Sequence, residues 1–223
     1  MFVSLVETRL SNYQPDSILQ LCDYAIFRND RESNGGGCLL AVNKKYPATR
    51  VQTHIECKIL AVDLLHSSVI LRVIVCYIPH INDINYLNKF FHQVHELITH
   101  TKQYIILGDF NFPDINWSTL EFPNTAPYQA LLDFIKLLQP VSQLINFLTR
   151  GSKILDLFLT NTETLFKDIQ SLPPLANSDH IVITGKFQFK CVLSRTEIKV
   201  FKNFKDADYN LLGNHICDQL NLL

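Results

Sequence analysis

Residues 104–117 have the sequence YIILGDFNFPDINW, and the rest of the fold is organised around this stretch. The apolar or aromatic residues 104–107 run directly into Gly108 and Asp109, and a continuous apolar run that ends at glycine predicts a strand buried on both faces. Because side chains alternate along an extended chain, Asp109 and Asn111 are expected to point the same way where the strand ends. This pair suggests a functional site. The alternative is a polar turn, in which both residue types are common.

Length and composition indicate one large domain, or one domain with a tail, in a chain of 223 residues. An apolar fraction of 47% is normal for a globular protein with a sizeable core. The formal net charge of −1 lacks the basic excess that many nucleic-acid-binding proteins show, although a local patch could still supply phosphate contacts.

The six cysteines are scattered and contain no C-x-x-C pair, which predicts buried thiols in a reducing compartment rather than a zinc site or a disulfide framework. The chain contains no apolar run of membrane-spanning length, and its first ten residues lack the basic start of a signal peptide. We therefore expect an intracellular protein that is not secreted and has no membrane partner. The nucleus is one compartment in which it could act.

Hydrophobic patterns predict helices over 85–100 and 126–138, and strands over 1–6, 24–28, 38–42, 54–64, 68–77, 104–107, 142–147, 154–160 and 181–189. Since strands outnumber helices, two packed sheets flanked by helices suit the pattern better than a doubly wound sheet. Residues 31–37 contain three glycines, and a hairpin turn is a better interpretation than a phosphate-binding loop because no G-x-G-x-x-G or G-K-[ST] follows. The histidines of the first helix are interpreted as a solvated face.

Polar side chains stand next to five of these strands, at Glu7, Tyr77, Asp109 with Asn111, Asp156, and Asp179 with His180. Groups at the ends of several strands are a common way to place a site on a rigid scaffold. A lone aspartate inside an apolar strand costs several kcal/mol if it is left unpaired, so Asp156 needs a partner. His180 is the expected one.

The chemistry of these residue types suggests metal-assisted attack of water on a phosphate ester. Glu7 and Asp179 supply the hard oxygen ligands that Mg²⁺ prefers. Asp109 could take a proton from the attacking water, and Asn111 could polarise the group beside it. His180, oriented by Asp156, and the hydroxyl of Tyr77 could both donate to phosphoryl oxygens.

The segments LVETRL, VCYIPH, ILGDFNFPDINW, ILDLFLTN and NSDH, in this order, resemble the endonuclease/exonuclease/phosphatase superfamily. The closest resemblance is to the apurinic-type endonuclease domain of non-LTR retrotransposons, for which T-R-G ahead of the L-D strand is typical. It covers residues 1–189. The resemblance implies an α/β fold, a four-layer α/β/β/α sandwich of two packed mixed sheets flanked by helices. It also implies a Mg²⁺-dependent endonuclease, with Mn²⁺ as the alternative ion, that nicks DNA to prime reverse transcription.

Carried over to this sequence, the resemblance implies metal ligands at Glu7 and Asp179 and catalytic roles for Tyr77, Asp109, Asn111, Asp156 and His180. It also implies an N-terminal truncation, because such domains begin with an earlier strand that carries an asparagine and with a helix. We expect an endonuclease domain at 1–190 and a tail at 191–223 that leads toward a reverse transcriptase domain. Two alternatives remain: a catalytically impaired fragment of a retroelement, and a phosphatase of the same fold.

Overall fold

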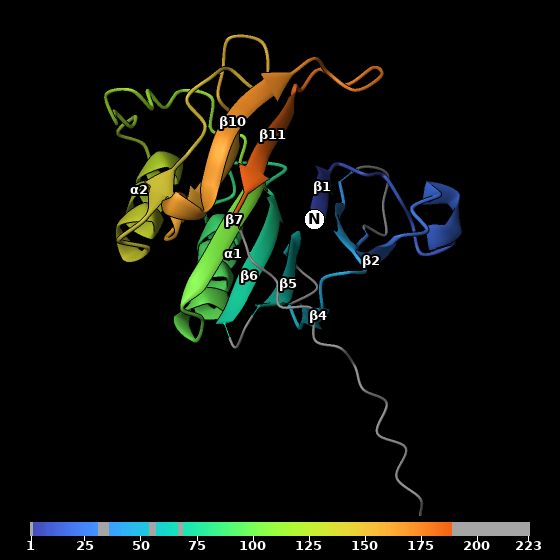
Figure 1. Ribbon diagram of the computed structural model, residues 1–223. Coiled ribbons are helices and arrows are strands. Elements are labelled where there is room, and N and C mark those ends of the chain that lie inside the picture. The colour runs from blue at the N-terminus through green and yellow to red at the C-terminus, as the bar shows by residue number, and fades with distance from the viewer. Residues whose placement is uncertain (1, 31–35, 54–56, 67–68, 189–223) are drawn as a thin grey trace, which may run out of the picture. The chain divides into compact units, whose positions relative to one another are not determined.

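The computed structural model describes residues 2–30, 36–53, 57–66 and 69–188, which form eleven strands, two α-helices and two short 3₁₀ helices (Figure 1). The strands are β1 (Phe2–Val6), β2 (Tyr24–Asn29), β3 (Cys38–Asn43), β4 (Ala48–Val51), β5 (Ile59–His66), β6 (Val69–Tyr77), β7 (Gln103–Asp109), β8 (Ser142–Gln143), β9 (Asp156–Thr160), β10 (Phe166–Leu172) and β11 (Val182–Phe187). The helices are α1 (Ile84–Thr99), α2 (Ala126–Leu137), η1 (Asp16–Leu19) and η2 (Glu163–Leu165).

The largest sheet has six strands in the order β4-β5-β6-β7-β9-β8. Strands β6 and β7 are parallel and the other neighbours are antiparallel, so the sheet is mixed. Helix α1 connects the parallel pair, as a parallel connection requires. Strand β7 forms from the apolar run of the 104–117 stretch and lies in the middle of the sheet, which confirms the prediction of a buried strand.

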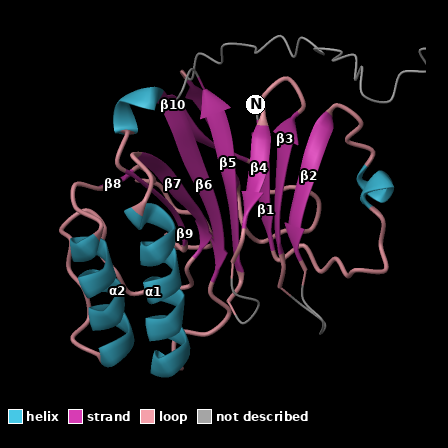
Figure 2. Cartoon of the chain, turned by 90° about the horizontal axis from the view of Figure 1, so that it is seen from below, coloured by secondary structure: helices cyan, strands magenta, loops and turns pink. Residues whose placement is uncertain are grey.

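Helices α1 and α2 cover one face of this sheet, as Figure 2 shows. Asp83 caps α1 by accepting a hydrogen bond from the amide of Tyr86 at 3.0 Å. The apolar side chains whose spacing predicts this helix are buried, and His92 and His100 are exposed, as expected of a solvated face. Gln93 is buried as well, which the periodicity did not indicate. The limits of α1 and α2 lie within two residues of the predicted ranges 85–100 and 126–138, so both predicted helices are confirmed.

The opposite face of the six-stranded sheet packs against a second layer of strands. This layer consists of a three-stranded antiparallel sheet, β1-β3-β2, and a two-stranded antiparallel sheet, β10-β11. The ring of Phe187 on β11 contacts that of Phe2 on β1, with centroids 6.5 Å apart, although these strands do not pair. The α/β sandwich is thus confirmed. Its second layer is divided in two, and in the described part of the chain both α-helices flank the first sheet.

Some strand limits were predicted wrongly. The strand expected at 142–147 ends after Gln143, because the Gln143 side chain bonds both the amide and the carbonyl of Ile145, each at 2.7 Å, and so ends the ladder. Strands β4 and β10 were not predicted, since their exposed faces leave little apolar pattern. The strand expected from residue 54 begins at Ile59, and residues 54–56 lie outside the described residues.

The hairpin expected at 31–37 connects β2 and β3, which are antiparallel, but residues 31–35 lie outside the described part. The chain divides into units at 1–193 and 194–223, and the second unit, with the predicted tail, lies outside the described residues. Within the described part, the helices are too short or too polar to cross a membrane.

Candidate active site

Three of the predicted site residues lie side by side on neighbouring strands. In the pairing of β6 with β7, Tyr77 is opposite Asp109, and in the pairing of β7 with β9, Asp109 is opposite Asp156. Tyr77 is buried among the residues between the two layers, and Asp109 is 1% exposed. The register therefore brings a phenol and two carboxylates to one level at the end of three strands.

Asn111 lies against Asp109, although not in the way that extended alternation would produce. The chain turns after β7, and Asn111 has a φ of 55°, a left-handed conformation that asparagine tolerates better than most residues. Its backbone amide donates to Asp109 Oδ1 and its side-chain amide to Oδ2, both at 3.0 Å. The same Nδ2 donates to the carbonyl of Ile78 at 2.8 Å. Both oxygens of Asp109 are thereby held in a fixed orientation.

Asp156 and His180 form the expected carboxylate–imidazole pair, with Nδ1 of His180 2.8 Å from Oδ2 of Asp156. The other ring nitrogen, Nε2, faces Oδ2 of Asp109 at 4.0 Å. His180 thus lies between the two carboxylates, with one nitrogen engaged by Asp156 and the other directed toward the catalytic candidate Asp109.

Glu7 follows β1 directly and is exposed, with a φ of 52°. Its charge is close enough to Asp109 to add to the rise in the pKa of that carboxyl. The backbone after Glu7 is fixed by hydrogen bonds from Thr8 to Gly37 at 3.5 Å and from Arg9 to Gly36 at 2.9 Å. Glu7 is therefore carried by the second layer of strands, whereas Asp109 and Asp156 belong to the first.

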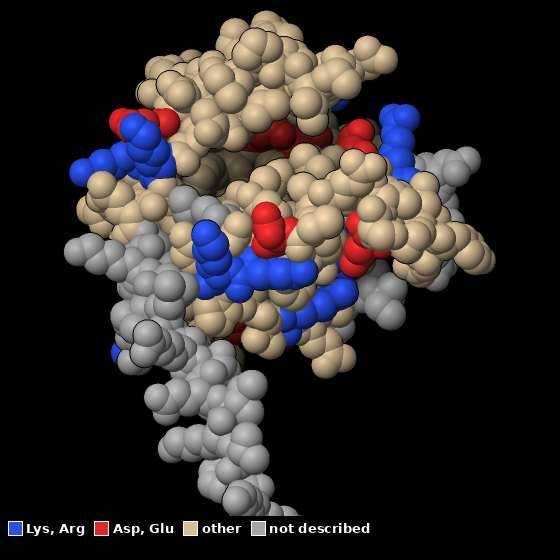
Figure 3. Space-filling view, turned by 45° about the vertical axis from the view of Figure 1, so that its right-hand side comes forward, with Lys and Arg blue, Asp and Glu red and all other residues tan. Residues whose placement is uncertain are grey.

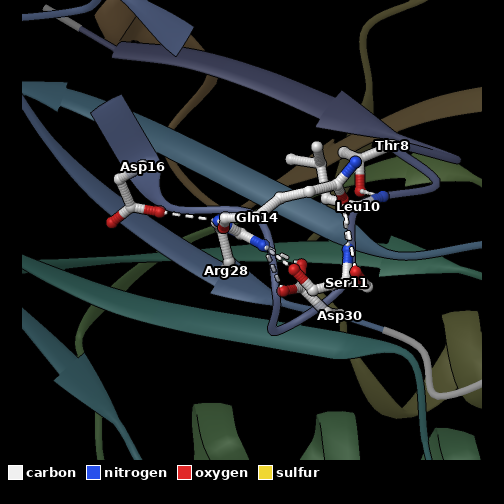
Figure 4. Close-up of polar contacts among 7 residues, drawn as sticks. All are labelled: Thr8, Leu10, Ser11, Gln14, Asp16, Arg28 and Asp30. Atoms are coloured by element: carbon white, nitrogen blue, oxygen red, sulfur yellow. Dashed lines mark hydrogen bonds and ion pairs between the residues drawn. The ribbon is translucent and has the colours of Figure 1, made fainter. Parts of the chain in front are cut away.

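The loop that follows Glu7 is held by Arg28 of β2, as Figure 4 shows. Its guanidinium donates to the carbonyls of Ser11 and Gln14 and to the Asp16 carboxylate, each at 2.8 Å, and it also pairs with Asp30. The Arg28 side chain is only 10% exposed, and its charge-assisted hydrogen bonds keep the loop close to β2.

Asp179 is predicted as a metal ligand, and the structure places it at the edge of the site. Its carboxylate pairs with Arg150, with Nη2 2.6 Å from Oδ2, and its side chain is 64% exposed. It neighbours His180 in the chain, but its carboxylate is engaged by the arginine. Asp179 is thus near the other site residues and is more open to solvent than Asp109 or Asp156.

The protonation equilibria reflect this crowding of negative charge. Burial, together with the nearby charge of Asp156, raises the pKa of Asp109 to about 7. The hydrogen bond to Asp156 raises the pKa of His180 above its usual value. Asp109 is therefore poised near neutral pH, where a group that accepts and returns protons works best.

The donor set fits a hard divalent cation. Among the described residues, no group of three or more His, Cys, Asp and Glu side chains is arranged to hold an ion. Mg²⁺ does not require one, because it is commonly bound through one or two carboxylates together with water and substrate phosphate. The negative charges of Asp156 and Glu7 both disfavour ionisation of Asp109, and a cation among these carboxylates would relieve that repulsion.

Thr149 is a residue of this site that the sequence pattern showed only as part of a turn. Its hydroxyl accepts hydrogen bonds from the amides of Leu155 at 2.9 Å and Asp156 at 3.1 Å. Its backbone carbonyl accepts one from Ile181 at 3.0 Å. Fully buried, Thr149 ties the segment that carries Asp156 to the segment that carries His180. Only the folded chain reveals this link, because the bonded segments are separated in sequence.

We expect Thr149→Val to lower the free energy of unfolding by about 2–4 kcal/mol, because two backbone amides lose their acceptor in a site with little water. Thr149→Ser keeps the hydroxyl and should cost only about 1 kcal/mol for the lost methyl group. Urea denaturation of the three proteins measures both effects. Equal losses for the two variants would contradict this assignment.

The fold is that of the endonuclease/exonuclease/phosphatase superfamily, whose enzymes are metal-dependent nucleases or phosphodiesterases. A family model described as "Endonuclease-reverse transcriptase" matches residues 71–184, about half of the chain, and the chain belongs to this family. The match confirms the resemblance of the sequence motifs to this superfamily. No curated protein matches the sequence significantly.

Solved structures share the fold at low sequence identity. The endonuclease domain of TRAS1, a telomere-specific non-LTR retrotransposon, is 11% identical with a TM-score of 0.58, and the match covers 75% of this chain and 81% of that one. The 3'-5' exonuclease NExo from Neisseria meningitidis is 14% identical with a TM-score of 0.62, covering 84% and 89%. An AP endonuclease from Archaeoglobus fulgidus is 13% identical with a TM-score of 0.60, covering 83% and 88%.

Proposed function

We propose that this chain is a Mg²⁺-dependent phosphodiester hydrolase, the DNA endonuclease of a non-LTR retrotransposon. The observation that carries the proposal is the position of His180, held by Asp156 at 2.8 Å and facing Asp109 at 4.0 Å. A buried carboxylate with a raised pKa beside an oriented imidazole suits hydrolysis at neutral pH. The family description and the TRAS1 domain support the retrotransposon assignment, and with it a reverse transcriptase domain as a partner.

In this mechanism Asp109 accepts a proton from the water that attacks phosphorus, and the amide of Asn111 keeps the carboxylate oriented toward that water. His180 donates from Nε2 to a phosphoryl oxygen as negative charge develops there, while Asp156 stabilises its protonated ring. Tyr77 lies at the same level and is assigned a contact to the phosphate. The P–O bond to the leaving oxygen then breaks, the electron pair stays on that oxygen, and the oxygen takes up a proton from the surrounding water.

Glu7 and Asp179 are the proposed ligands of the metal ion, which is Mg²⁺ or alternatively Mn²⁺. When bound, such an ion withdraws electron density from the phosphate and lowers the pKa of coordinated water. Glu7 is well placed for this role because it is exposed and yet interacts electrostatically with Asp109. The exposed carboxylate of Asp179 has a second oxygen beyond the one that pairs with Arg150.

Nicking of supercoiled plasmid DNA by the purified chain tests the proposal. We expect relaxed circles in the presence of Mg²⁺, none in EDTA, and loss of nicking in His180→Ala. His92→Ala is the matched control, because His92 is an exposed histidine on α1 whose described ion pair is with Glu96. Nicking by His180→Ala at the normal rate would refute the mechanism.

The same preparation separates the alternatives. A phosphatase would release inorganic phosphate from nucleotides or from 3′-phosphorylated DNA without cutting the plasmid. A catalytically impaired fragment would do neither, and calorimetric titration with Mg²⁺ and with duplex DNA would detect no binding. Either result would overturn the assignment as an endonuclease.

A further inference from the structure

Arg150 lies in the turn that precedes β9, next to the proposed active site. Its backbone forms isolated antiparallel bridges with Lys153 and with His180. Its guanidinium pairs with the carboxylate of Asp179 at 2.6 Å, and its charge opposes the rise in the pKa of His180 that Asp156 causes. The backbone bridge and the electrostatic effect both place this cation beside the imidazole, although the sequence pattern indicated no role for it beyond a turn.

The charges around the site are mostly negative, so a positively charged side chain at its edge would favour an anionic substrate. Glu7, Asp109, Asp156 and Asp179 are all acidic, and each of them would repel a phosphodiester. Among the described residues, two basic side chains take part in these interactions: His180 acts on Asp109, and Arg150 acts on His180. Figure 3 shows a face with acidic side chains recessed in a hollow and basic ones around it, rather than a continuous basic surface. On this face a nucleic acid would meet separate cations and no continuous basic patch.

The ion pair between Arg150 and Asp179 is suited to exchange. The two side chains are 44% and 64% exposed, and ion pairs in contact with water add little to stability. The pair with Asp179 therefore adds little to the stability of the fold, whereas the planar fork of donors on Arg150 matches the oxygens of a phosphate. Arg150 can leave Asp179 for a stronger acceptor without disturbing buried structure.

We propose that Arg150 binds a phosphate of the nucleic-acid backbone at the edge of the active site and that Asp179 holds its guanidinium in position before the substrate arrives. This inference rests on the proposed function and adds a substrate-binding residue to it. The contact is to a non-bridging phosphate oxygen. It therefore strengthens binding and positions the nucleic acid, but it does not select among bases.

Binding in EDTA tests the inference without catalysis. The full chain is titrated against a fluorescent 20-base-pair duplex at several salt concentrations, using the wild type, Arg150→Ala and Arg150→Lys. We expect Arg150→Ala to weaken binding about tenfold and to reduce the slope of log affinity against log salt by about 1, because one phosphate contact is lost. Arg150→Lys should keep the slope, because the charge is retained, but recover only part of the affinity, because an ammonium lacks the planar fork of donors.

Lys136→Ala is the matched control, because Lys136 is an exposed cation paired with Asp133 at 3.2 Å in the last turn of α2. It should leave affinity and slope unchanged. The inference is overturned if Arg150→Ala behaves like Lys136→Ala, or if the wild type does not bind the duplex. If binding depends on Arg150 but Mg²⁺ produces no nicking, the proposed function fails while the phosphate contact stands. If the wild type nicks and Arg150 has no effect on binding, the inference alone fails.

Discussion

Asp109→Asn is expected to reduce the rate of plasmid nicking by about 10³-fold while the chain stays folded, since loss of a general base typically costs about 10²- to 10⁴-fold. The substitution keeps the shape of the side chain but removes the only group in the described site that is both buried and poised to accept a proton near pH 7. Initial rates on supercoiled plasmid at about pH 7.5 with Mg²⁺ measure the effect.

Asp114→Asn serves as the control for that variant. Asp114 lies in the loop after β7, where it accepts hydrogen bonds from Tyr128 at 2.8 Å and from Lys153 at 3.3 Å. Its nicking rate should stay within about threefold of the wild type, because surface substitutions away from the site have small effects. A rate for Asp109→Asn equally close to the wild type would exclude Asp109 as the base.

The pH dependence of stability in the wild type and in Asp109→Asn gives an independent measure of the raised pKa of the Asp109 carboxyl. Its native pKa of about 7 lies above the ordinary value of 3.8, so the native state retains this proton to higher pH than the unfolded chain does. The stability that results is present below about pH 4 and is lost as the pH rises toward 7. Measured in EDTA, the unfolding free energy of the wild type should therefore fall across this range relative to that of Asp109→Asn.

Gly108→Ala is expected to abolish folding, or to lower the unfolding free energy by more than about 4 kcal/mol. Gly108 has a φ of 137°, a conformation that side chains rarely adopt. A β-carbon there would lie 1.9 Å from the backbone oxygen of Cys76, its partner on β6. Because that oxygen belongs to a central strand, it cannot move aside without breaking the sheet. Yield of soluble protein and urea denaturation measure the loss.

Gly151→Ala is the matched control, since Gly151 also has a positive φ, 54°, but a β-carbon there would meet nothing within 4 Å. Gly151→Ala should lower the free energy of unfolding by only roughly 1–2 kcal/mol, which is the cost of placing alanine in a left-handed conformation. If both variants were similarly stable, the close approach at Gly108 would be irrelevant to folding.

The elements that the sequence predicted well are those whose apolar pattern is strong. Strand β7 and helix α1 each bury a continuous set of side chains, so their positions could be read from the spacing of apolar residues. Strand β10 exposes most of its side chains, so its pattern carries little information. The short β8 depends on a side chain that bonds its own backbone, an interaction that periodicity does not detect.

The candidate site was predictable as a set of residues but not as an arrangement. An aspartate in an apolar strand requires a partner, and this argument correctly paired Asp156 with His180. The left-handed turn at Asn111, the hydroxyl of Thr149 and the pairing of Arg150 with Asp179 depend on tertiary contacts. Local sequence carries no information on these, because the partners approach only after the strands have assembled.

The division of the second layer gives the site two mechanically separate supports. Glu7 follows β1, whose described strand pairing is with β3, while Asp179 and His180 precede β11, which pairs with β10. Apolar packing, such as the contact of Phe2 with Phe187, joins the two supports where strand pairing does not. The distance between Glu7 and Asp179 therefore depends on side-chain packing and not on a hydrogen-bonded ladder. If Glu7 and Asp179 hold a metal ion as proposed, its affinity would depend on how well this packing aligns the two halves of the second layer.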